Sequence, residues 1–349
     1  MLVAFNTSPI NDLNRVRGVG TYTANILGEL KKNKEITILP FEKTLPANVD
    51  IIHYPYFDLF FHTLPIKSKV KKVVTIHDVI PLVFPDHFPH GLKGNLNLFF
   101  QKMALKNVDA VICDSKTSKK DIVDKLNYPE KKIHVVYLAA GNFFKKISDS
   151  KEMSSVIEKY NLPQKFVLYV GDINWNKNIT NLLEAIKIAK VNLVMVGKTI
   201  ADETTAQSKE ITSQIKKIGI ESKVLKIGFV QNSDLVTIYN LAQVTLTPSQ
   251  YEGFGLPVLE SMACGTPVIC SNNSSLAEIA PPQAILCNPD NPNDIAQKIT
   301  KVFNLPQKTK DLLSKKLIAH AAKFTWQKTA QETIAVYKHV LKDEDIRNQ

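Results

Sequence analysis

Short runs of β-branched residues alternate with helical patterns along this chain, and this alternation constrains the fold more than any other feature. Such repeats are typical of βαβ units, in which parallel strands form a sheet covered by helices. In the first half, strands are expected at 2–6, 36–40, 50–54, 72–77, 110–114 and 134–138, and helices at 20–32, 91–107 and 116–126. The chain is therefore expected to be an α/β protein.

A second series of units follows. Strands are expected at 166–171, 192–197, 224–228, 243–248 and 267–271, and helices at 177–189, 205–218, 233–241, 257–264, 307–323 and 326–342. The polar segment from Gly141 to about Ser155 is expected to be a linker. With 349 residues, 44% of them hydrophobic, the chain is long enough for two domains that each bury a core. We expect domains at 1–155 and 156–325, and a helix within 326–349 that could return to the first domain.

The net charge of +11 is carried almost entirely by lysine, because only three arginines occur, Arg15, Arg17 and Arg347. Nucleic-acid recognition favours arginine, whose planar guanidinium matches guanine and phosphate, and no basic run alternates with aromatic residues. A nucleic-acid partner is therefore not expected. Two interpretations of the lysines remain open: an ordinary solvated surface, or weak attraction to an anionic membrane or acceptor.

The four cysteines, Cys113, Cys264, Cys270 and Cys287, form no C-x-x-C pair and have no histidine at zinc-binding spacing. We expect them to be reduced and no metal site to be present. The opening MLVAFNTSPI lacks the basic start and long apolar run of a signal peptide, and no stretch approaches the roughly 20 apolar residues of a membrane span. The expected location is the cytoplasm or a membrane surface facing it.

Ligands bind beyond the carboxyl ends of the strands in open parallel sheets, so the loops after strands are the places to search. In RVRGVGTYT (15–23), Gly18 and Gly20 precede a helix, where glycine lets the backbone approach an anion and the helix dipole favours negative charge. The pattern only nearly matches a dinucleotide fingerprint. A phosphate or sugar contact is favoured, while a ligand-free turn and a dehydrogenase-type cofactor site stay open.

In TIHDVIP (75–81), His77 ends an apolar strand and is expected to face the crevice. Its ring could donate to a sugar hydroxyl, or stabilise a developing positive sugar ring through a neutral dipole. A lone histidine is often structural, so that interpretation stays open. Asp78 is expected to cap the following turn rather than to orient the imidazole.

In GDINWNKN (171–178), Gly171 ends a strand and Lys177 falls near the start of the next helix. A cation at a helix N-terminus is unfavourable unless an anion is also present, so a phosphate partner is expected, with an exposed lysine as the alternative. In VMVGK (194–198), Gly197 ends the next strand and is expected to line the same site.

The loop and helix in PSQYEGFGLPVLE (248–260) contribute most to the interpretation. Pro257 suits the first turn of a helix, and Glu252 and Glu260 are both expected to border its N-terminus. The backbone N–H groups available for phosphate or sugar oxygens belong to Phe254, Gly255 and Leu256. A sugar nucleotide needs such donors, together with acceptors for its hydroxyls. The alternative is that Glu260 only complements the helix dipole and Glu252 is solvated.

The stretch YEGFGLPVLESMACGTPVICSNNSSLAEI resembles the family-4 retaining glycosyltransferases of the GT-B fold, whose E-x7-E signature is present as Glu252 and Glu260. The resemblance extends over most of the chain, through GVGTYT, TIHDVIP, CDSKTSKKDI, GDINWNKNITNLLEAI, GFVQNSDLVTIYNLA and FTWQKTAQETIAVY. It implies two Rossmann-like domains with parallel sheets facing across a cleft, the first on the acceptor side and the second binding the donor. The H-D-x-x-P form is similar to the branch that contains many GDP-mannose-dependent mannosyltransferases of surface-polysaccharide pathways.

The resemblance also implies roles for single residues. Glu252 would contact the hydroxyls of the donor hexose, and Glu260 would bind the ribose. Lys177 would pair with the diphosphate, and His77 would contact the transferred sugar. The backbone amides at Gly253 to Leu256 would hold sugar and phosphate oxygens. Gly18 and Gly20 would approach the phosphates and leave room for the acceptor.

The chain departs from the family near Lys177, where the family usually places an arginine beside the lysine or a few residues before it. These positions are Asp172 and Asn176 here. The diphosphate would then depend on Lys177 and backbone amides, or on another cation such as Lys198.

We therefore expect a retaining transferase that moves a hexose, most simply mannose from GDP-mannose, to a glycan or lipid-linked acceptor without a metal or other cofactor. The acceptor hydroxyl would attack from the leaving-group face, and a phosphate oxygen would take its proton. Alternatives are a UDP-glucose or UDP-N-acetylglucosamine donor, a non-catalytic sugar-nucleotide- or glycan-binding subunit and, more distantly, a dehydrogenase. The aromatic stretch 54–65 could be core, membrane-facing or acceptor-facing.

Overall fold

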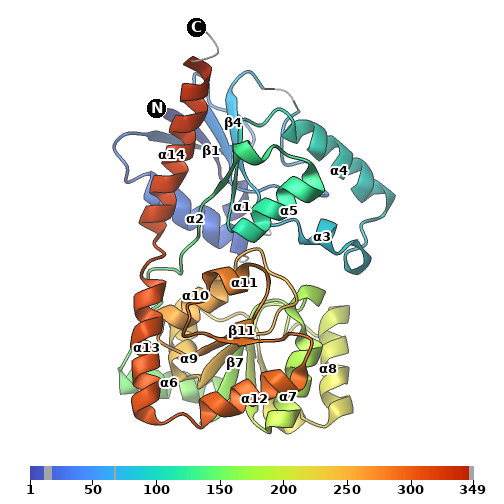
Figure 1. The fold of residues 1–349 in the computed structure, drawn as a ribbon, viewed down its shortest axis with the longest axis vertical. Coiled ribbons are helices and arrows are strands. Elements are labelled where there is room, and N and C mark those ends of the chain that lie inside the picture. Colours follow the sequence, from blue (N-terminus) through green and yellow to red (C-terminus); the bar gives the residue numbers. More distant parts are fainter. Residues whose placement is uncertain (12–17, 67, 346–349) are drawn as a thin grey trace. The chain divides into compact units, whose positions relative to one another are not determined.

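The computed structural model describes residues 1–11, 18–66 and 68–345, and the chain divides into two compact units (Figure 1). The first unit consists of Met1–Ala139 together with Phe324–Gln349, and the second unit of Ala140–Lys323. Each unit contains one parallel sheet flanked by helices, as the alternation of strand and helix patterns predicts.

The first unit contains six parallel strands in the order β2-β1-β3-β4-β5-β6. Their bounds are β1 (Leu2–Asn6), β2 (Thr37–Phe41), β3 (Ile51–Tyr54), β4 (Lys71–Thr75), β5 (Ala110–Cys113) and β6 (Ile133–Val135). All four residues of β5 and four of the five in β4 are buried. Burial of this extent is typical of strands covered by helices on both faces.

The helices of the first unit include one that comes from the far end of the sequence. They are α1 (Ser8–Asn11), α2 (Gly18–Leu30), α3 (Ile80–Val83), α4 (Gly91–Leu105), α5 (Lys116–Leu126) and α14 (Trp326–Asp345), with short 3-10 turns η1 (Pro85–His87) and η2 (Glu130–Lys132). Helix α14 packs against α2, and its Trp326 and Tyr337 side chains are fully buried. Tyr337 Oη lies 2.5 Å from His53 Nδ1, so α14 also supplies a polar contact to β3.

The second unit contains six parallel strands in the order β12-β11-β10-β7-β8-β9. Their bounds are β7 (Phe166–Val170), β8 (Asn192–Val196), β9 (Val224–Ile227), β10 (Val244–Thr247), β11 (Val268–Ser271) and β12 (Ile285–Cys287). The helices are α6 (Ser150–Tyr160), α7 (Ile179–Ala189), α8 (Ala206–Ile218), α9 (Asn232–Leu241), α10 (Leu256–Ala263), α11 (Ser274–Ile279), α12 (Pro292–Phe303) and α13 (Gln307–Ala321), with 3-10 turns η3 (Trp175–Lys177) and η4 (Glu221–Lys223). Side chains from α7, α8 and α12 share one apolar core with the sheet.

The expected linker is partly wrong, because helix α6 begins within it at Ser150. Asp149 caps the helix by accepting hydrogen bonds from the N–H groups of Lys151 and Glu152, and Val156 is buried. The helix packs against α9, so the proposed boundary between 155 and 156 falls inside an element of the second unit. The sequence is polar here because α6 buries only a narrow stripe.

The two sheets share a topological property that positions ligands. Chain order reverses between β1 and β3 in the first sheet, and between β7 and β10 in the second. At such a switch point, the connections that leave neighbouring strands run in opposite directions and leave a crevice at the carboxyl ends of the strands. The segments after β7 and β10 are therefore the natural place for a ligand in the second unit.

Candidate functional site

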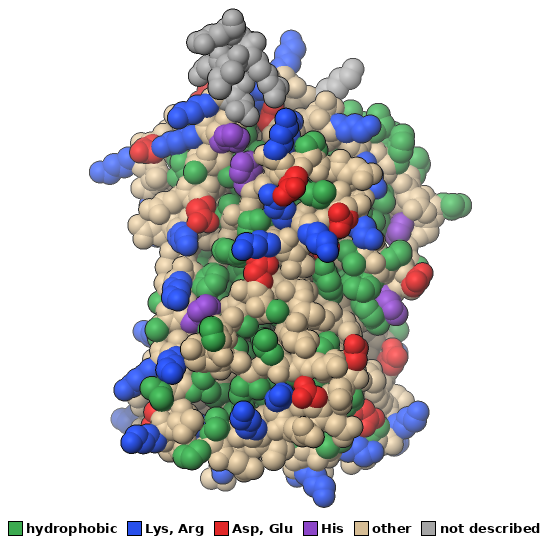
Figure 2. All heavy atoms as spheres, in the orientation of Figure 1, with side chains coloured by type: hydrophobic (Ala, Val, Ile, Leu, Met, Phe, Trp, Pro, Cys, Tyr) green, Lys and Arg blue, Asp and Glu red, His purple; other side chains and the backbone are tan. Residues whose placement is uncertain are grey.

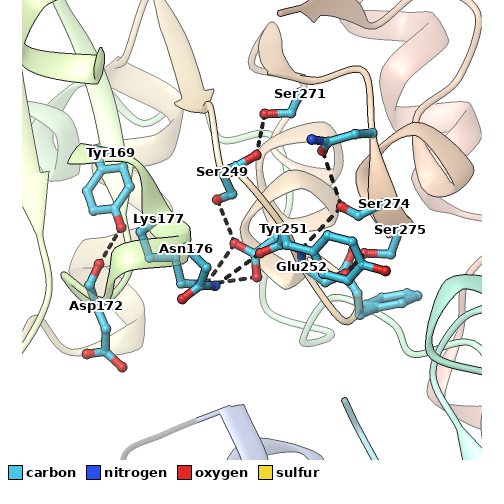
Figure 3. A network of polar contacts seen from close by, with 12 residues as sticks. Tyr169, Asp172, Asn176, Lys177, Ser249, Tyr251, Glu252, Ser271, Ser274 and Ser275 are labelled. Atoms are coloured by element: carbon cyan, nitrogen blue, oxygen red, sulfur yellow. Dashed lines mark hydrogen bonds and ion pairs between the residues drawn. The ribbon is translucent and has the colours of Figure 1, made fainter. Parts of the chain in front are cut away.

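A lysine–glutamate pair lies at the switch point of the second sheet. Lys177 follows β7 in the turn η3, and Glu252 follows β10. Lys177 Nζ lies 2.7 Å from Glu252 Oε1 and 2.9 Å from Oε2, so the ammonium group binds both carboxylate oxygens (Figure 3). Two residues that are 75 positions apart in the sequence, and that were assigned separate roles toward a donor, thus form one ion pair.

Glu252 is held by three serines around the loop of residues 248–255, here named the Glu252 loop. Ser249 Oγ donates to Glu252 Oε1 at 2.7 Å, which fixes the carboxylate. The backbone N–H of Glu252 donates to Ser274 Oγ at 3.2 Å, and its carbonyl oxygen accepts from Ser275 Oγ at 2.8 Å (Figure 3). The carboxylate is therefore positioned from its side chain and from its backbone.

The segment after β7 also binds the Glu252 loop directly. Asn176 Nδ2 donates to the carbonyl oxygen of Tyr251 at 3.0 Å, and the Asn176 carbonyl accepts from the Gln250 N–H at 2.7 Å. Asn178 Nδ2 donates to the Pro248 carbonyl at 2.8 Å. These contacts of Asn176 and Asn178 were not predicted, although the asparagine-rich NWNKN segment and the polar SNNSS run at 271–275 are both visible in the sequence.

The Glu252 loop ends at the N-terminus of α10. Gly255 is the N-cap residue, and its φ of 112° favours glycine; a Cβ atom there would also lie 2.5 Å from Leu276 Cδ2, so that side chain would have to move. Pro257 occupies the first turn, as expected. Within the described part of the chain, the N–H groups of Gly255 and Leu256 donate to no other residue. Such groups at a helix N-terminus can bind an anion.

Gly171 and Gly197, two expected donor-site residues, lie side by side at the ends of β7 and β8. A Cβ atom on Gly197 would be 2.1 Å from the Gly171 carbonyl oxygen, and Gly171 has φ of 152°. The close approach of the two backbones thus accounts for the glycine at Gly197.

Glu260 is not joined to the Lys177–Glu252 pair. Its carboxylate accepts a hydrogen bond from Tyr239 Oη of α9 at 2.7 Å. Burial raises the pKa of Glu260 to about 7, despite this hydrogen bond, which lowers it. Glu260 therefore lies one turn inside α10, as expected, but its side chain faces α9.

His77 lies just beyond β4 in the first unit and pairs with Asp114, just beyond β5. His77 Nδ1 is 2.7 Å from Asp114 Oδ2, and Nε2 is 3.2 Å from the Pro55 carbonyl oxygen. The ring of Tyr22 meets the imidazole edge-on at a centroid distance of 4.7 Å. Asp78 accepts from the Ile80 N–H at 3.0 Å, so it caps the turn as expected and Asp114 orients the imidazole.

These contacts favour a charged His77, in contrast to the expected neutral dipole. Both ring nitrogens face oxygen acceptors, and only an imidazolium can donate from both. Burial alone would lower the pKa of His77, but the neighbouring Asp114 carboxylate outweighs it and the pKa is raised. The second carboxylate oxygen, Asp114 Oδ1, is buried without a hydrogen-bond partner in the structure described.

The other expected site residues differ in their surroundings. Gly18 is the exposed first residue of α2, and no described residue would lie within 4 Å of a Cβ atom there. Gly20 is buried. Asp172 accepts from Thr199 Oγ1 at 3.3 Å, and Lys198 is exposed. All three arginines, Arg15, Arg17 and Arg347, lie outside the described residues.

A hollow of about 710 Å³ lies at the carboxyl ends of β1, β2 and β3 in the first unit. Its lining includes five aromatic rings and two carboxylates, namely Phe41, Tyr54, Tyr56, Phe61, His62, Glu42 and Asp58. Tyr56 Oη donates to Asp58 Oδ2 at 2.7 Å. The aromatic stretch 54–65 therefore contributes both to the core, through Phe57, and to the lining of this hollow, through Tyr56 and Phe61.

The described residues contain neither a cluster of metal-ligating side chains nor a helix suited to cross a membrane. Across residues 1–11, 18–66 and 68–345, no three histidine, cysteine, aspartate or glutamate side chains are grouped so that they could hold a metal ion. Across the same ranges, every helix is too short or too polar to cross a membrane.

Comparisons with known proteins identify families for both halves of the chain. Residues 150–324 match the family described as glycosyl transferases group 1, and residues 36–139 match glycosyltransferase family 4. The O-antigen chain mannosyltransferase B of Escherichia coli is 29% identical over 270 residues, which are 77% of this chain and 70% of that protein. The serotype-specific mannosyltransferase WbdA of Escherichia coli is 29% identical over 283 residues, 78% of this chain; the match spans 34% of WbdA.

Among solved structures, sucrose-phosphate synthase from Thermosynechococcus elongatus is similar with a TM-score of 0.77 and 18% sequence identity. The similarity covers 98% of this chain and 100% of that chain. It concerns the fold, and it confirms the expected α/β class with two Rossmann-like domains of the GT-B type.

Proposed function

Because this chain belongs to the glycosyl transferases of group 1 and is a glycosyltransferase, we propose that it transfers a hexose from a nucleotide sugar to a glycan or lipid-linked acceptor with retention of configuration. The observation that carries the proposal is the Lys177–Glu252 pair at the switch point, beside the N-terminus of α10. It combines a cation, a fixed carboxylate and backbone donors at the edge of the sheet where ligands bind.

The donor diphosphate is proposed to bind Lys177 and the N–H groups at Gly255 and Leu256. Lys177 now interacts with both oxygens of Glu252, so an arriving diphosphate would compete for the ammonium group. Glu252 would then be released to accept hydrogen bonds from hexose hydroxyls, while Ser249 continues to hold it. Binding of the donor would thus prepare the carboxylate for the sugar.

The proposed transfer breaks the bond between the anomeric carbon and the phosphate oxygen. The acceptor oxygen attacks the same face, its proton passes to a phosphate oxygen, and the nucleoside diphosphate leaves. Lys177 and the α10 amides would stabilise the charge that develops on the leaving group, without a metal ion. Glu260 is proposed to bind the ribose, and the imidazolium of His77 is proposed to contact the transferred sugar.

We propose mannose from GDP-mannose as the donor, because the two relatives are named as mannosyltransferases and the HDVIP segment has the form seen in that branch. A UDP-sugar donor is the alternative. For the acceptor, the hollow at β1 to β3 offers rings and carboxylates of the kind that bind sugar faces and hydroxyls. Surface-polysaccharide synthesis on the cytoplasmic side of a membrane is the proposed setting.

A non-catalytic nucleotide-sugar-binding subunit is the second candidate. It is favoured by Asp172 and Asn176, which occupy positions where the family usually has arginine. Asparagine is neutral and aspartate is acidic, so neither residue adds positive charge to the site. In the structure, Asn176 donates to the Tyr251 carbonyl and Asp172 accepts from Thr199.

A donor panel followed by product analysis tests both candidates. Thermal unfolding would be measured with GDP-mannose, UDP-glucose, UDP-N-acetylglucosamine and free GDP, because a ligand of the folded state raises the midpoint. The stabilising donor would then be incubated with acceptor glycans, with and without EDTA, and analysed by mass. We expect GDP-mannose to stabilise the protein and to yield a product one hexose heavier, with EDTA having no effect. Stabilisation without release of nucleoside diphosphate would favour the binding subunit.

A further inference from the structure

Helix α4 of the first unit has two apolar faces, and only one of them packs against the protein. Its inner side buries Gly94, Gln101, Ala104 and Leu105. The outer side carries Leu92, Leu96, Phe99 and Met103, which are 89%, 56%, 59% and 38% exposed. These four residues, here named the outer face of α4, follow one another at spacings of four, three and four, so they form a single stripe along the helix.

The exposure does not come from a detached helix. Gln101 Nε2 donates to the Asp58 carbonyl at 2.6 Å and to Thr63 Oγ1 at 2.7 Å, and Asn97 Nδ2 donates to the Phe60 carbonyl at 2.7 Å. The helix is thus fixed to residues 58–64, and the same segment presents Phe61, which is 67% exposed. The folded first unit therefore displays a rigid row of large apolar side chains.

The charges on α4 are all positive. The helix contains no aspartate or glutamate, while Lys93 and Lys102 lie within it and Lys106 directly follows it. At 100° per residue, Lys93 flanks the stripe on one side, and Lys102 and Lys106 flank it on the other. Figure 2 shows hydrophobic side chains gathered along the edge where Figure 1 places α4. An apolar stripe with lysines on both sides matches an anionic lipid interface, which offers acyl chains below its headgroups.

A second copy of the chain fits this surface less well. A stable protein interface buries roughly 800 Å² on each partner, more than four side chains of one helix supply. A twofold contact would also bring the lysines of two α4 helices together, and α4 has no carboxylate to pair with them. The same lysines would favour a surface rich in phosphate.

We propose that the outer face of α4, together with Phe61, inserts shallowly into an anionic bilayer and holds the first unit on it. The inference rests on the proposed function in that a lipid-linked acceptor would be reached at such a surface. A helix lying in the interface binds through buried apolar area and through attraction of its cations to anionic headgroups. Binding should therefore depend on both the stripe and the lysines.

The test is flotation of the full chain with vesicles of phosphatidylcholine, with and without 30 mol% phosphatidylglycerol. The variant Leu92→Ser/Leu96→Ser/Phe99→Ser is expected to reduce binding to the anionic vesicles at least tenfold. Its matched control is Ile188→Ser/Phe229→Ser/Leu312→Ser, which removes three exposed apolar residues from the second unit and should bind like wild type. Lys93→Gln/Lys106→Gln should bind several-fold more weakly and with less dependence on salt.

Donor-induced thermal stabilisation is measured on every variant, so that loss of folding or of donor binding is distinguished from loss of lipid binding. Wild-type protein that fails to float with anionic vesicles would overturn the proposal. Equal flotation of the α4 triple variant and wild type would do so too. A wild-type dimer in sedimentation without lipid, dissociated by the α4 changes, would instead assign the surface to a second copy.

Discussion

The His77–Asp114 and Lys177–Glu252 pairs both join a cation to a carboxylate at 2.7 Å beyond the carboxyl ends of parallel strands. They differ in what surrounds them. The side chains of His77 and Asp114 are 15% and 3% exposed, and His77 is also bonded to the Pro55 carbonyl and covered by Tyr22. Lys177 and Glu252 are 23% and 10% exposed and lie beside free helix amides. We infer that the enclosed His77–Asp114 pair stays intact, whereas the more exposed Lys177–Glu252 pair can open when a ligand binds.

The largest difference between the two pairs should appear in activity when the Glu252 carboxylate is removed. Glu252→Ala is expected to lower kcat/KM by roughly 10²–10³-fold, because it removes a preorganised acceptor and leaves Lys177 without its partner. Steady-state kinetics with the donor chosen by the panel would measure this. Glu203→Ala, which removes another lysine-paired carboxylate of the second unit, is the control and should retain activity. Wild-type rates for Glu252→Ala would remove its proposed role.

Removing the Lys177 ammonium should have the next largest effect. Lys177→Met is expected to weaken donor binding by about 10–100-fold, the usual range for a charge-assisted hydrogen bond. Calorimetry would compare the nucleotide sugar with the free nucleoside, which has no diphosphate and should bind equally to both proteins. Lys226→Met is the matched control, because Lys226 also pairs with a glutamate of the second unit. An equal loss for nucleoside and nucleotide sugar would contradict a diphosphate contact.

Asp114→Asn tests the His77–Asp114 pair, because it removes the negative charge that raises the pKa of His77. The pKa of His77 should fall, and kcat/KM should drop by about tenfold. NMR titration of the imidazole would follow the pKa, a readout that a merely structural loss would not move. Retention of the raised pKa in Asp114→Asn would show that the carboxylate is not its cause.

The raised pKa of His77 also links the first pair to stability. The folded-state pKa lies above the unfolded value of 6.5. The contribution of His77 to the free energy of unfolding is therefore complete below pH 6.5 and is lost as the pH rises through the folded-state pKa. Denaturant unfolding of wild type and His77→Gln across this range should show the difference between them shrinking with pH.

The smallest expected effect concerns Glu260. Its pKa of about 7 means that the carboxylate ionises near neutrality, and an ionised carboxylate accepts hydrogen bonds more strongly than a protonated one. Donor affinity should therefore rise by about two- to fivefold from pH 6 to pH 8, and Glu260→Gln should flatten that change. The nucleoside alone should show the same dependence if Glu260 binds ribose. Identical pH profiles for wild type and variant would contradict the assignment.

Much of the fold could be predicted from the sequence, because buried parallel strands and amphipathic helices leave local patterns. The strands near 2–6 and 166–171 and the helix at 116–126 are close to the observed elements. Helix α12 was not predicted although the sequence carries its signals: Asn291 caps it, Pro292 begins it, and the buried Ile295, Ile299 and Val302 recur at helical spacing. Helix α6 lies in the segment predicted as a linker, because that segment is mostly polar and only Val156 of the helix is buried.

The candidate site could be predicted only as a set of residue types at the ends of strands. Glu252, Lys177 and the α10 amides were identified, since glycines, a proline and charges near a helix start are local signals. The pairing of Lys177 with Glu252 and the contact of Glu260 with Tyr239 depend on side-chain directions across separate elements. The contacts of Asn176 and Asn178 with the Glu252 loop likewise join residues about 70 positions apart. No local pattern carries that information.

The chain leaves the first unit at Ala139 and re-enters it at Phe324, so the second unit is an insertion within the first. During synthesis from the N-terminus, residues 140–323 can complete their own sheet while the earlier half still lacks α14. Until Trp326 and Tyr337 emerge, α2 has no partner for its α14-facing side and His53 lacks its tyrosine hydroxyl. In a nascent chain stalled before residue 324, the second unit would be complete while the first unit would still lack α14. The first unit, although its translation begins first, would therefore finish folding last.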